Sequence, residues 1–285
     1  MLYKFHSFES LLNLGAALLS PSPSNRLDAL LLLCKASGLK KEQLIAHITD
    51  KVTTNIALRF FHYIGKRKSK IPLAYLLGKK EFYNLKFIVN PAVLIPRPET
   101  EGLIDLALKY IDNSKLIRVI DLGTGSGCIA ISLLKKSPQN LQIDAIDISK
   151  QALKIAKLNA KEILGEDARR IKFKRYDYLS QEINGKYDLV IANPPYVPIE
   201  IESELEKDIS FEPRIAIFAK NKGLQYYYAI KKLLERNLLI SGVALIEIGP
   251  QKYEDLYQIF KDSFEIKILP DLTGRDRYLV ISPLS

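Results

Sequence analysis

Leucines in the first 75 residues follow the spacing of an amphipathic helix. The clearest run consists of Leu11, Leu12, Leu14, Leu18 and Leu19. This spacing places apolar side chains on one face of a helix. Further helices are predicted over residues 29–36, 40–48 and 54–66, with a helix start near Asn25 and Asp28 and a stop at Gly38. Because leucine stripes are usually buried, this part is predicted to be a small helical bundle.

The pattern changes after residue 78. Residues 81–83 and 86–89 combine aromatic and β-branched side chains, and they flank Asn84-Leu85. Two such runs around a short polar break predict a β-hairpin. Prolines then follow at positions 91, 96 and 98, which is typical of a linker.

From residue 100 onward, runs with helical spacing alternate with short apolar runs. Strands are predicted over residues 117–122, 141–147, 171–176, 188–192, 243–248, 264–269 and 278–281. Helices are predicted over residues 100–110, 128–136, 150–164, 224–234 and 252–260. This alternation predicts an α/β fold with a doubly wound, mostly parallel, seven-stranded sheet. Because no helix separates the last two strands, one antiparallel strand is expected.

Composition places the chain among ordinary globular proteins. It has 285 residues, of which 47% are apolar and 26% charged. No apolar run reaches the length of a membrane-spanning helix, and residues 1–7 lack the pattern of a secretory leader, so a cytoplasmic protein is expected. Cys34 and Cys128 lie far apart, and all three histidines fall within the first 65 residues. Neither a disulfide framework nor a metal site is therefore expected.

The positive charge is concentrated near the start of the chain. Residues 1–80 carry +9 of the formal net charge of +10, and residues 66–70 (KRKSK) form the densest run. Such an asymmetry indicates a docking surface for an acidic protein or for nucleic acid. A basic face that merely contacts solvent explains the charge equally well.

A glycine-rich loop follows the first predicted strand of the sheet. Its proposed ligand-binding positions are Gly123, Thr124, Gly125, Ser126 and Gly127. Glycines let the backbone turn tightly and approach a ligand closely. The next strand ends at Asp147, where a carboxylate accepts hydrogen bonds from ribose hydroxyls. A dinucleotide site would place the third glycine one residue later, so the loop instead resembles the first motif of class I S-adenosylmethionine-dependent methyltransferases.

Two further strand ends carry candidate site residues. Asp177 and Tyr178 follow the third strand, where Asp177 is expected to accept from an adenine amine and Tyr178 to stack on the ring, although a plain loop explains them nearly as well. Asn193-Pro194-Pro195-Tyr196 follows the fourth strand. The prolines stiffen this segment and keep Asn193 extended. A rigid rim with an amide oxygen, a backbone carbonyl and an aromatic face suits the binding of a planar NH₂ group.

Taken together, these segments resemble the bacterial peptide-chain release factor glutamine N5-methyltransferases over nearly the full length of the chain. The resemblance is carried by residues 95–101 (IPRPETE), 121–127 (DLGTGSG), 193–196 (NPPY), 211–214 (FEPR), 247–249 (EIG) and 271–277 (DLTGRDR). One departure is Tyr178, where the family often has tryptophan, so weaker stacking is expected. Residues 97–101 are expected near the cofactor pocket, without an assigned role.

The resemblance implies three parts. These are a helical substrate-docking domain over residues 1–77, a hairpin linker over 78–96 and a methyltransferase domain over 97–285. It implies S-adenosyl-L-methionine as cofactor, S-adenosyl-L-homocysteine as product, no metal, and the Gly-Gly-Gln loop of class 1 release factors as acceptor, with neither nucleic acid nor membrane required.

The same resemblance assigns roles to the tetrapeptide. The Asn193 oxygen and the Pro194 carbonyl would accept the two amide hydrogens of the glutamine, and Asn193 would also border the cofactor. Pro195 and Tyr196 would contact the acceptor, with Tyr196 excluding water. No general base is demanded, because the methylated nitrogen becomes strongly acidic.

Two other functions remain open at this stage. Adenine-N6 and guanine-N2 methyltransferases share the Asn-Pro-Pro-Tyr tetrapeptide, and flipped bases need the same NH₂ clamp. A basic adaptor with a vestigial cofactor pocket is the second, and the intact glycine loop, Asp147 and tetrapeptide argue against it.

Overall fold

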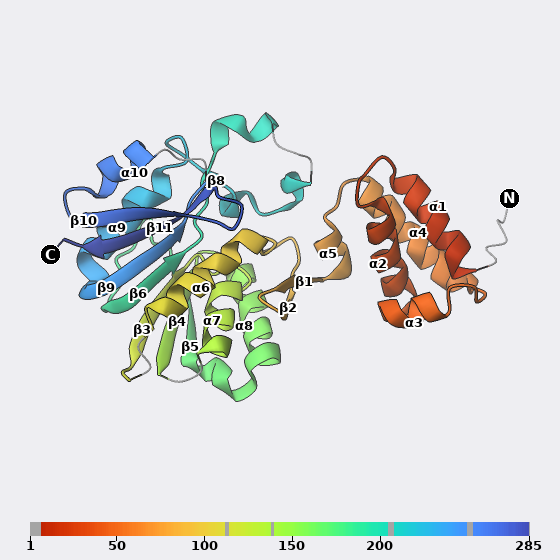
Figure 1. Cartoon of the computed structure of the whole chain (residues 1–285), viewed down its shortest axis with the longest axis horizontal. Helices are drawn as coiled ribbons and strands as arrows, with labels where there is room; N and C mark the ends of the chain where they lie inside the picture. The colour runs from red at the N-terminus through yellow and green to blue at the C-terminus, as the bar shows by residue number, and fades with distance from the viewer. Residues whose placement is uncertain (1–6, 112–113, 138–139, 205–207, 250–252, 285) are drawn as a thin grey trace. The chain divides into compact units, whose positions relative to one another are not determined.

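The computed structural model describes residues 7–111, 114–137, 140–204, 208–249 and 253–284 (Figure 1). The chain divides into two compact units. One comprises Met1–Lys79 with Glu206–Phe211, and the other comprises Lys80–Leu205 with Glu212–Ser285. Within the described ranges, no helix has the length and apolar character needed to cross a membrane.

The first unit is a helical bundle, as predicted. Its helices are α1 (Phe8–Leu19), α2 (Asn25–Ser37), α3 (Lys41–Ala46), α4 (Thr54–Lys68) and α5 (Leu73–Leu77). The Ser7 side chain caps α1, and Gly38, with φ of 78°, ends α2 in the left-handed conformation. Helix α5 was not predicted, because it is a single short turn between Pro72 and Gly78.

The leucine stripe of α1 is only partly buried. Leu11, Leu12 and Leu19 belong to the bundle core, as predicted. The prediction was wrong for Leu14 and Leu18, which are each 38% exposed. The stripe is wider than the surface that α2 and α4 cover, so its outer edge meets solvent.

One member of the basic run has a structural partner. Arg67 Nε donates to Asp28 Oδ2 at 2.8 Å, and Arg67 Nη1 donates to Asp208 Oδ2 at 2.9 Å. The Asp28 side chain is only 5% exposed. The buried Asp28 carboxylate is therefore paired with the half-buried Arg67 guanidinium, in addition to lying in the first turn of α2.

The predicted hairpin is confirmed, with its turn shifted by one residue. Strands β1 (Lys79–Phe82) and β2 (Leu85–Ile88) form a two-stranded sheet. The turn is made by Tyr83 and Asn84, with φ of 51° and 58°, rather than by Asn84 and Leu85. Positive φ at both central positions is the geometry whose twist matches a two-residue hairpin.

The second unit contains the predicted seven-stranded sheet in the order β10-β11-β9-β6-β3-β4-β5. Its strands are β3 (Ile117–Leu122), β4 (Leu141–Asp147), β5 (Ile171–Arg175), β6 (Tyr187–Ala192), β9 (Leu238–Glu247), β10 (Phe264–Pro270) and β11 (Asp276–Pro283). Strand β11 runs antiparallel to both of its neighbours, β9 and β10, as expected for one antiparallel strand in a mostly parallel sheet. Strand β9 begins five residues earlier than expected, because Leu238 pairs with Tyr187 across an irregular stretch.

Helices cover both faces of this sheet. They are α6 (Glu101–Lys109), α7 (Cys128–Lys136), α8 (Lys150–Leu164), α9 (Gln225–Asn237) and α10 (Tyr253–Phe260). The start predicted for α10 at residue 252 lies outside the described residues. Short 3₁₀ helices, none of them predicted, are η1 (Pro98–Thr100), η2 (Gly165–Arg170), η3 (Ile199–Glu204), η4 (Ile209–Phe211) and η5 (Arg214–Ala216). Strands β7 (Val197–Pro198) and β8 (Phe218–Ala219) form a small extra pair.

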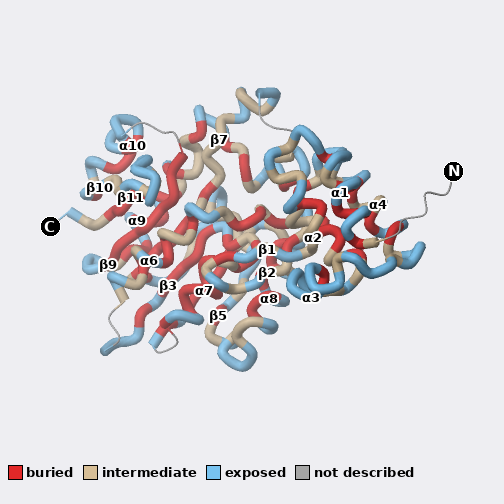
Figure 2. Tube along the Cα trace, turned by 45° about the vertical axis from the view of Figure 1, so that its right-hand side comes forward, coloured by how far each residue is buried: buried red, intermediate tan, exposed pale blue. Residues whose placement is uncertain are grey.

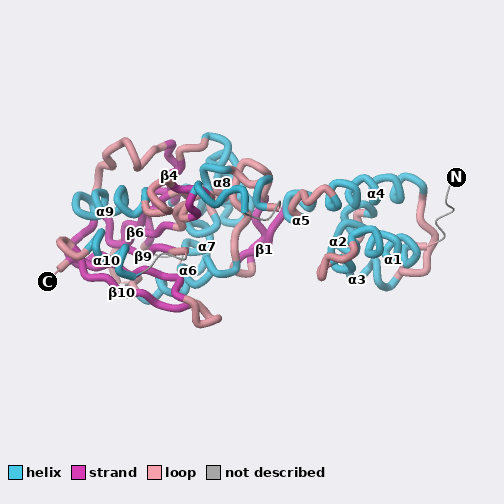
Figure 3. The backbone as a smooth tube through the Cα atoms, turned by 90° about the horizontal axis from the view of Figure 1, so that it is seen from above, coloured by secondary structure: helices cyan, strands magenta, loops and turns pink. Residues whose placement is uncertain are grey.

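Alternation along the strands builds two cores. Val119 faces α6, α7 and α8, whereas its neighbour Ile120 faces α9 and α10. The central strands are consequently buried on both sides, as the burial colouring shows (Figure 2). Seen from above, helices lie on either side of the strands (Figure 3). This three-layer arrangement is the doubly wound α/β fold, which binds ligands at the carboxyl ends of its strands.

Candidate active site

The sheet register brings the candidate loops to one edge. Leu122, the last residue of β3, pairs with Ile146 of β4 on one side and with Ala192 of β6 on the other. The neighbouring strands β3, β4 and β6 therefore end at the same level of the sheet. The residues at or directly after these ends are the glycine loop, Asp147 and Asn193. Strand β9 continues this edge, because Ala192 also pairs with Ile246, so that Glu247 ends its strand beside Asn193.

The glycine loop depends on left-handed backbone conformations. Gly125 has φ of 56° and Gly127 has φ of 80°, which side chains rarely tolerate. A Cβ atom on Gly127 would lie 2.8 Å from Ile131 Cδ1 and 3.2 Å from Ala156 Cβ. Gly127 thus allows α7 to start against α8, whereas Gly125 faces the cavity described below.

Asp147 organises this loop. Its Oδ2 accepts from the Gly125 N–H at 2.9 Å, and its Oδ1 accepts from the Ser149 N–H at 2.8 Å. Burial raises the pKa of Asp147, and these two backbone hydrogen bonds act in the opposite direction. A carboxylate has about four lone-pair sites, so two acceptor sites remain after the backbone contacts.

One cavity collects most of the predicted site residues. Those that line it are Gly123, Gly125, Asp147, Asp177, Tyr178, Asn193 and Pro195. Thr124 instead donates its hydroxyl to Asp121 Oδ2 at 2.6 Å, and Ser126 is 2% exposed. Thr124, Ser126 and Gly127 therefore shape the loop behind the cavity, and Pro194 and Tyr196 do not border this cavity.

The sequence did not single out the apolar walls of the cavity. They include Val93, Leu94, Ile148, Ile215 and Tyr226. The Tyr226 ring, from α9, lies 5.8 Å from the Tyr178 ring at an interplanar angle of 53°. Tyr178 is thus paired with a second aromatic ring at the wall of the cavity. The position of Ile148 directly after Asp147 was the one local signal among these residues.

Asp177 is engaged within its own loop. Its Oδ1 accepts from the Leu179 N–H at 3.0 Å, and its Oδ2 accepts from the Ser180 hydroxyl at 2.7 Å. These bonds build a turn at the end of β5, as the loop explanation predicts, and Asp177 also lines the cavity. Contact with an adenine amine stays a prediction, and it would use the remaining lone pairs.

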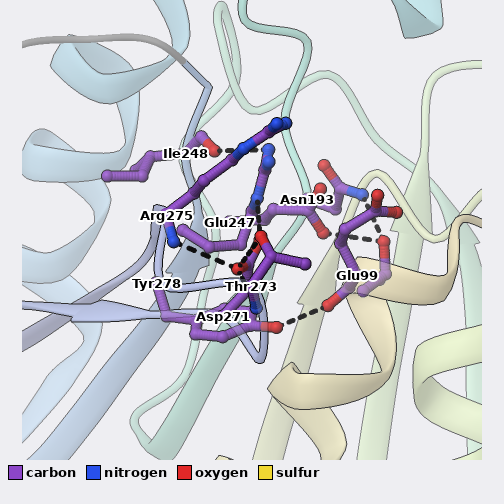
Figure 4. Close-up of polar contacts among 10 residues, drawn as sticks. Glu99, Asn193, Glu247, Ile248, Asp271, Thr273, Arg275 and Tyr278 are labelled. Carbon is purple, nitrogen blue, oxygen red and sulfur yellow. Dashed lines mark hydrogen bonds and ion pairs between the residues drawn. The ribbon is translucent and has the colours of Figure 1, made fainter.

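Asn193 is held by a chain of polar contacts. Its Nδ2 donates to Thr100 Oγ1 at 3.0 Å, and Thr100 Oγ1 donates to Glu247 Oε2 at 2.7 Å. Figure 4 shows Asn193, Glu247, Glu99 and Tyr278 gathered at this point from distant segments. Burial raises the pKa of Glu247 to about 7, against the hydrogen bond from Thr100 and the charge of Arg277.

A second polar contact holds the segment that enters the site. Glu212, 5% exposed, accepts from the Ile95 N–H at 2.9 Å and from Arg97 Nη2 at 2.6 Å. The next residue, Pro213, and Ile215 line the cavity. The segments 95–101 and 211–214 therefore act together, and they hold one wall of the cavity in place.

Tyr196 packs closely against the backbone after β9. Burial raises the pKa of its hydroxyl. A Cβ atom on Gly249 would clash with the Tyr196 ring, at Cδ2 and Cε2. The glycine of the segment 247–249 is therefore required for the position of this ring.

Replacing Gly249 by alanine is expected to displace Tyr196. Overpacking of this kind costs about 1–3 kcal/mol of unfolding free energy. Gly65 in α4 offers a matched control, because a Cβ atom there meets nothing within 4 Å. Gly65→Ala should stabilise its helix by about 0.5–1 kcal/mol. Chemical denaturation of both variants checks the pair, and an unchanged Gly249→Ala protein would contradict the packing described.

Comparisons with known proteins agree with this architecture. Residues 10–78 match the family described as the PrmC N-terminal domain, and residues 104–209 match the methyltransferase small domain. Among solved structures, the catalytic domain of hMettl16 in complex with a MAT2A 3′UTR hairpin has a TM-score of 0.55 at 18% identity. That match covers 76% of this chain and 80% of that one, and it shows a shared fold.

Curated relatives cover nearly the whole chain. The release factor glutamine methyltransferase of Koribacter versatilis is 34% identical over 91% of each chain. The one from Leptospira interrogans is 38% identical, over 91% of this chain and 92% of its own. A bifunctional methyltransferase of Rickettsia conorii is 33% identical over 92% of this chain and 55% of its own. The predicted resemblance is thus confirmed, and the chain belongs to the family of release factor glutamine methyltransferases.

Proposed function

We propose that this protein transfers a methyl group from S-adenosylmethionine to the side-chain amide nitrogen of the glutamine in the Gly-Gly-Gln motif of peptide chain release factors. The observation that carries the proposal is the orientation of Asn193. Its NH₂ end is bonded to Thr100 at 3.0 Å, while the residue lines the cavity of Gly125 and Asp147. The amide oxygen is therefore left to accept from an NH₂ group.

The residues around the cavity fit S-adenosylmethionine. Asp147 retains two acceptor sites for ribose hydroxyls. The backbone at Gly123 and Gly125 has no side chain between it and a ligand, and Tyr178 and Tyr226 offer aromatic walls for the adenine. When bound, the cofactor supplies an electrophilic methyl group on a sulfonium that leaves as neutral S-adenosylhomocysteine.

The acceptor needs positioning more than proton abstraction. An amide nitrogen is a poor nucleophile, because its lone pair is delocalised into the carbonyl. The Asn193 oxygen and the Pro194 carbonyl would each accept one amide hydrogen, which orients the nitrogen and stabilises the charge that it gains. Such positioning supplies up to about 7–11 kcal/mol. Each preorganised partner contributes about 3 kcal/mol, by analogy with oxyanion-hole donors.

The bonds that change are few. The N–C bond forms as the C–S bond breaks, and the electron pair of the C–S bond stays on sulfur. The methylated nitrogen then loses one proton to water. Tyr196, whose ring packs over Gly249, would contact the acceptor together with Pro195 and keep water away from the transfer.

The same proposal assigns a separate role to each of three parts of the chain. Residues 1–77 would dock the release factor, residues 78–96 would link the two domains, and residues 97–285 would carry the chemistry. The charge of +9 over residues 1–80 supports docking of an acidic partner surface. Arg67 is excluded from that role, since it is paired with Asp28 and Asp208.

Mass spectrometry tests the proposed function directly. The protein is incubated with isotopically labelled S-adenosylmethionine and unmodified release factor, with ribosomal RNA and DNA as parallel acceptors. One added methyl group on the glutamine of the Gly-Gly-Gln motif is expected. Label on nucleic acid, with release factor unmodified, would refute the proposal and assign the basic residues to nucleic-acid binding.

A further inference from the structure

Three segments that are remote in sequence meet behind Asn193. Glu247 is the last residue of β9, which lies between β11 and β6. Glu247 pairs with Tyr278 of β11, and the preceding residue, Ile246, pairs with Ala192 of β6. Thr100 reaches the same point from the end of η1. Thr100 is 2% exposed and Glu247 is 1% exposed, so bulk water does not satisfy their polar atoms.

The chemistry of these groups fixes the direction of each hydrogen bond. An ionised carboxylate only accepts, so the Thr100 hydroxyl proton points to Glu247 Oε2, at 2.7 Å. The Thr100 oxygen then has only lone pairs left for Asn193. It accepts from the Nδ2 atom of Asn193 at 3.0 Å and cannot donate to the Oδ1 atom.

We infer that Thr100 is a positioning residue for methyl transfer, which together with Glu247 determines the end of the Asn193 amide that faces the acceptor. The inference rests on the proposed function, in which the Asn193 oxygen accepts from the substrate NH₂ group. If the Asn193 amide were flipped, its NH₂ group would face the NH₂ group of the substrate glutamine. Both groups are hydrogen-bond donors, so no hydrogen bond could form between them. While Glu247 is ionised, the relay from Glu247 through Thr100 excludes that arrangement.

The backbone at Thr100 is itself fixed from β11. The Tyr278 hydroxyl donates to the Glu99 carbonyl at 2.6 Å, as drawn in Figure 4. Gly102 permits this approach, because a Cβ atom there would clash with the Tyr278 hydroxyl. The segment Glu99 to Gly102 is therefore anchored independently of Asn193, as a positioning element must be.

The relay is sensitive to the protonation of Glu247. A protonated carboxyl can donate to Thr100, and the Thr100 hydroxyl can then donate to Asn193 Oδ1, which reverses the amide. Burial raises the pKa of Glu247 to about 7. The charged and titratable groups that act on it are Arg97, Glu99, Cys128, Tyr196, Tyr227, Arg277 and Tyr278. Among them, Arg277 and Arg97 favour the carboxylate, and Glu99 opposes it.

The direction in which kcat changes with pH follows from the ionised fraction of Glu247. The carboxylate fraction rises from about a tenth at one pH unit below the pKa to about nine-tenths at one unit above it. The rate constant kcat of the wild-type protein should therefore rise as pH increases through about 7. In Glu247→Gln the group no longer titrates, so this rise should disappear.

The experiment compares Thr100→Val with Thr100→Ser in the full-length protein. Valine has nearly the shape of threonine but has no hydroxyl, whereas serine keeps the hydroxyl. Thr100→Val should lower kcat about 10-fold to 100-fold, because the Nδ2 donor of the half-buried Asn193 loses its partner and the amide can flip. Thr100→Ser should stay within about 3-fold of the wild type. The KM for release factor and the Kd for S-adenosylmethionine should change little in both variants.

Several outcomes overturn the inference. A Thr100→Val protein with the kcat of the wild type would overturn it. An equal loss of kcat in Thr100→Val and Thr100→Ser would also overturn it. If Thr100→Val fails to fold, the pH profile of Glu247→Gln decides, and a profile like that of the wild type overturns the inference. Failure of the proposed function looks different, since the wild-type protein itself would then leave the release factor unmethylated.

Discussion

Asn193→Ala should nearly abolish methyl transfer while leaving the affinity for S-adenosylmethionine within a few-fold. The side chain is the one that the proposed mechanism places on the acceptor nitrogen. Loss of a preorganised partner at a reacting centre typically costs about 10²–10³-fold in kcat. Alanine also leaves Thr100 Oγ1 without its donor, but Thr100 keeps its bond to Glu247 at 2.7 Å, so the fold should persist.

A matched variant separates this effect from general damage. Asn184 is an exposed asparagine of the same unit and lies outside the cavity that Asn193 lines. Asn184→Ala should behave like the wild type in both assays. Calorimetric titration with S-adenosylmethionine, run beside a single-turnover methylation assay, gives both quantities. Equal loss of binding and transfer in Asn193→Ala would refute the division of labour between this residue and the cofactor site.

The sequence was sufficient for those features that depend on neighbouring residues. The glycine loop, Asp147 and Asn193 each follow directly on an apolar run, so strand, loop and chemistry are encoded within a few positions. Parallel strands end at a common edge, which brings together loops separated by some 70 residues. The register of Leu122 with Ile146 and Ala192 bears this out.

Features that depend on distant pairing could not be predicted in this way. Glu247 pairs with Tyr278 and hydrogen-bonds Thr100, and nothing in the local pattern of any of them specifies the others. The segments 95–101 and 247–249 carried the resemblance to the family without an assigned role. The structure relates both of them to Asn193. Tyr226 was missed for a similar reason, because its helix follows β6 by more than 30 residues.

Burial of side chains was predicted less well than the elements that carry them. Leu14 and Leu18 have helical spacing, but the width of the contact with other helices depends on tertiary packing. Thr124 illustrates the reverse case, since a polar residue in a ligand loop turns inward to Asp121. Burial raises the pKa of Asp121 to about 7, which the sequence pattern alone did not indicate.

Asp147→Ala is expected to have the largest effect on cofactor affinity. The carboxylate organises the loop through the N–H groups of Gly125 and Ser149, and its remaining lone pairs are predicted to accept from ribose hydroxyls. Hydrogen bonds to a charged group contribute about 1.5–3 kcal/mol each. Loss of two such bonds to the cofactor corresponds to a rise in Kd of about 10²-fold or more, at 1.4 kcal/mol for each factor of ten.

The same strand supplies the control for this variant. Asp144 also lies on β4, but it accepts from the Tyr187 hydroxyl at 2.8 Å and lies outside the cavity of Asp147. Asp144→Ala should lower the unfolding temperature and leave the Kd for S-adenosylmethionine near that of the wild type. Because Asn193 and Pro194 are untouched in Asp147→Ala, its kcat should recover at saturating cofactor. An unchanged Kd, or a kcat that stays low at saturation, would contradict the assignment of Asp147 to cofactor binding.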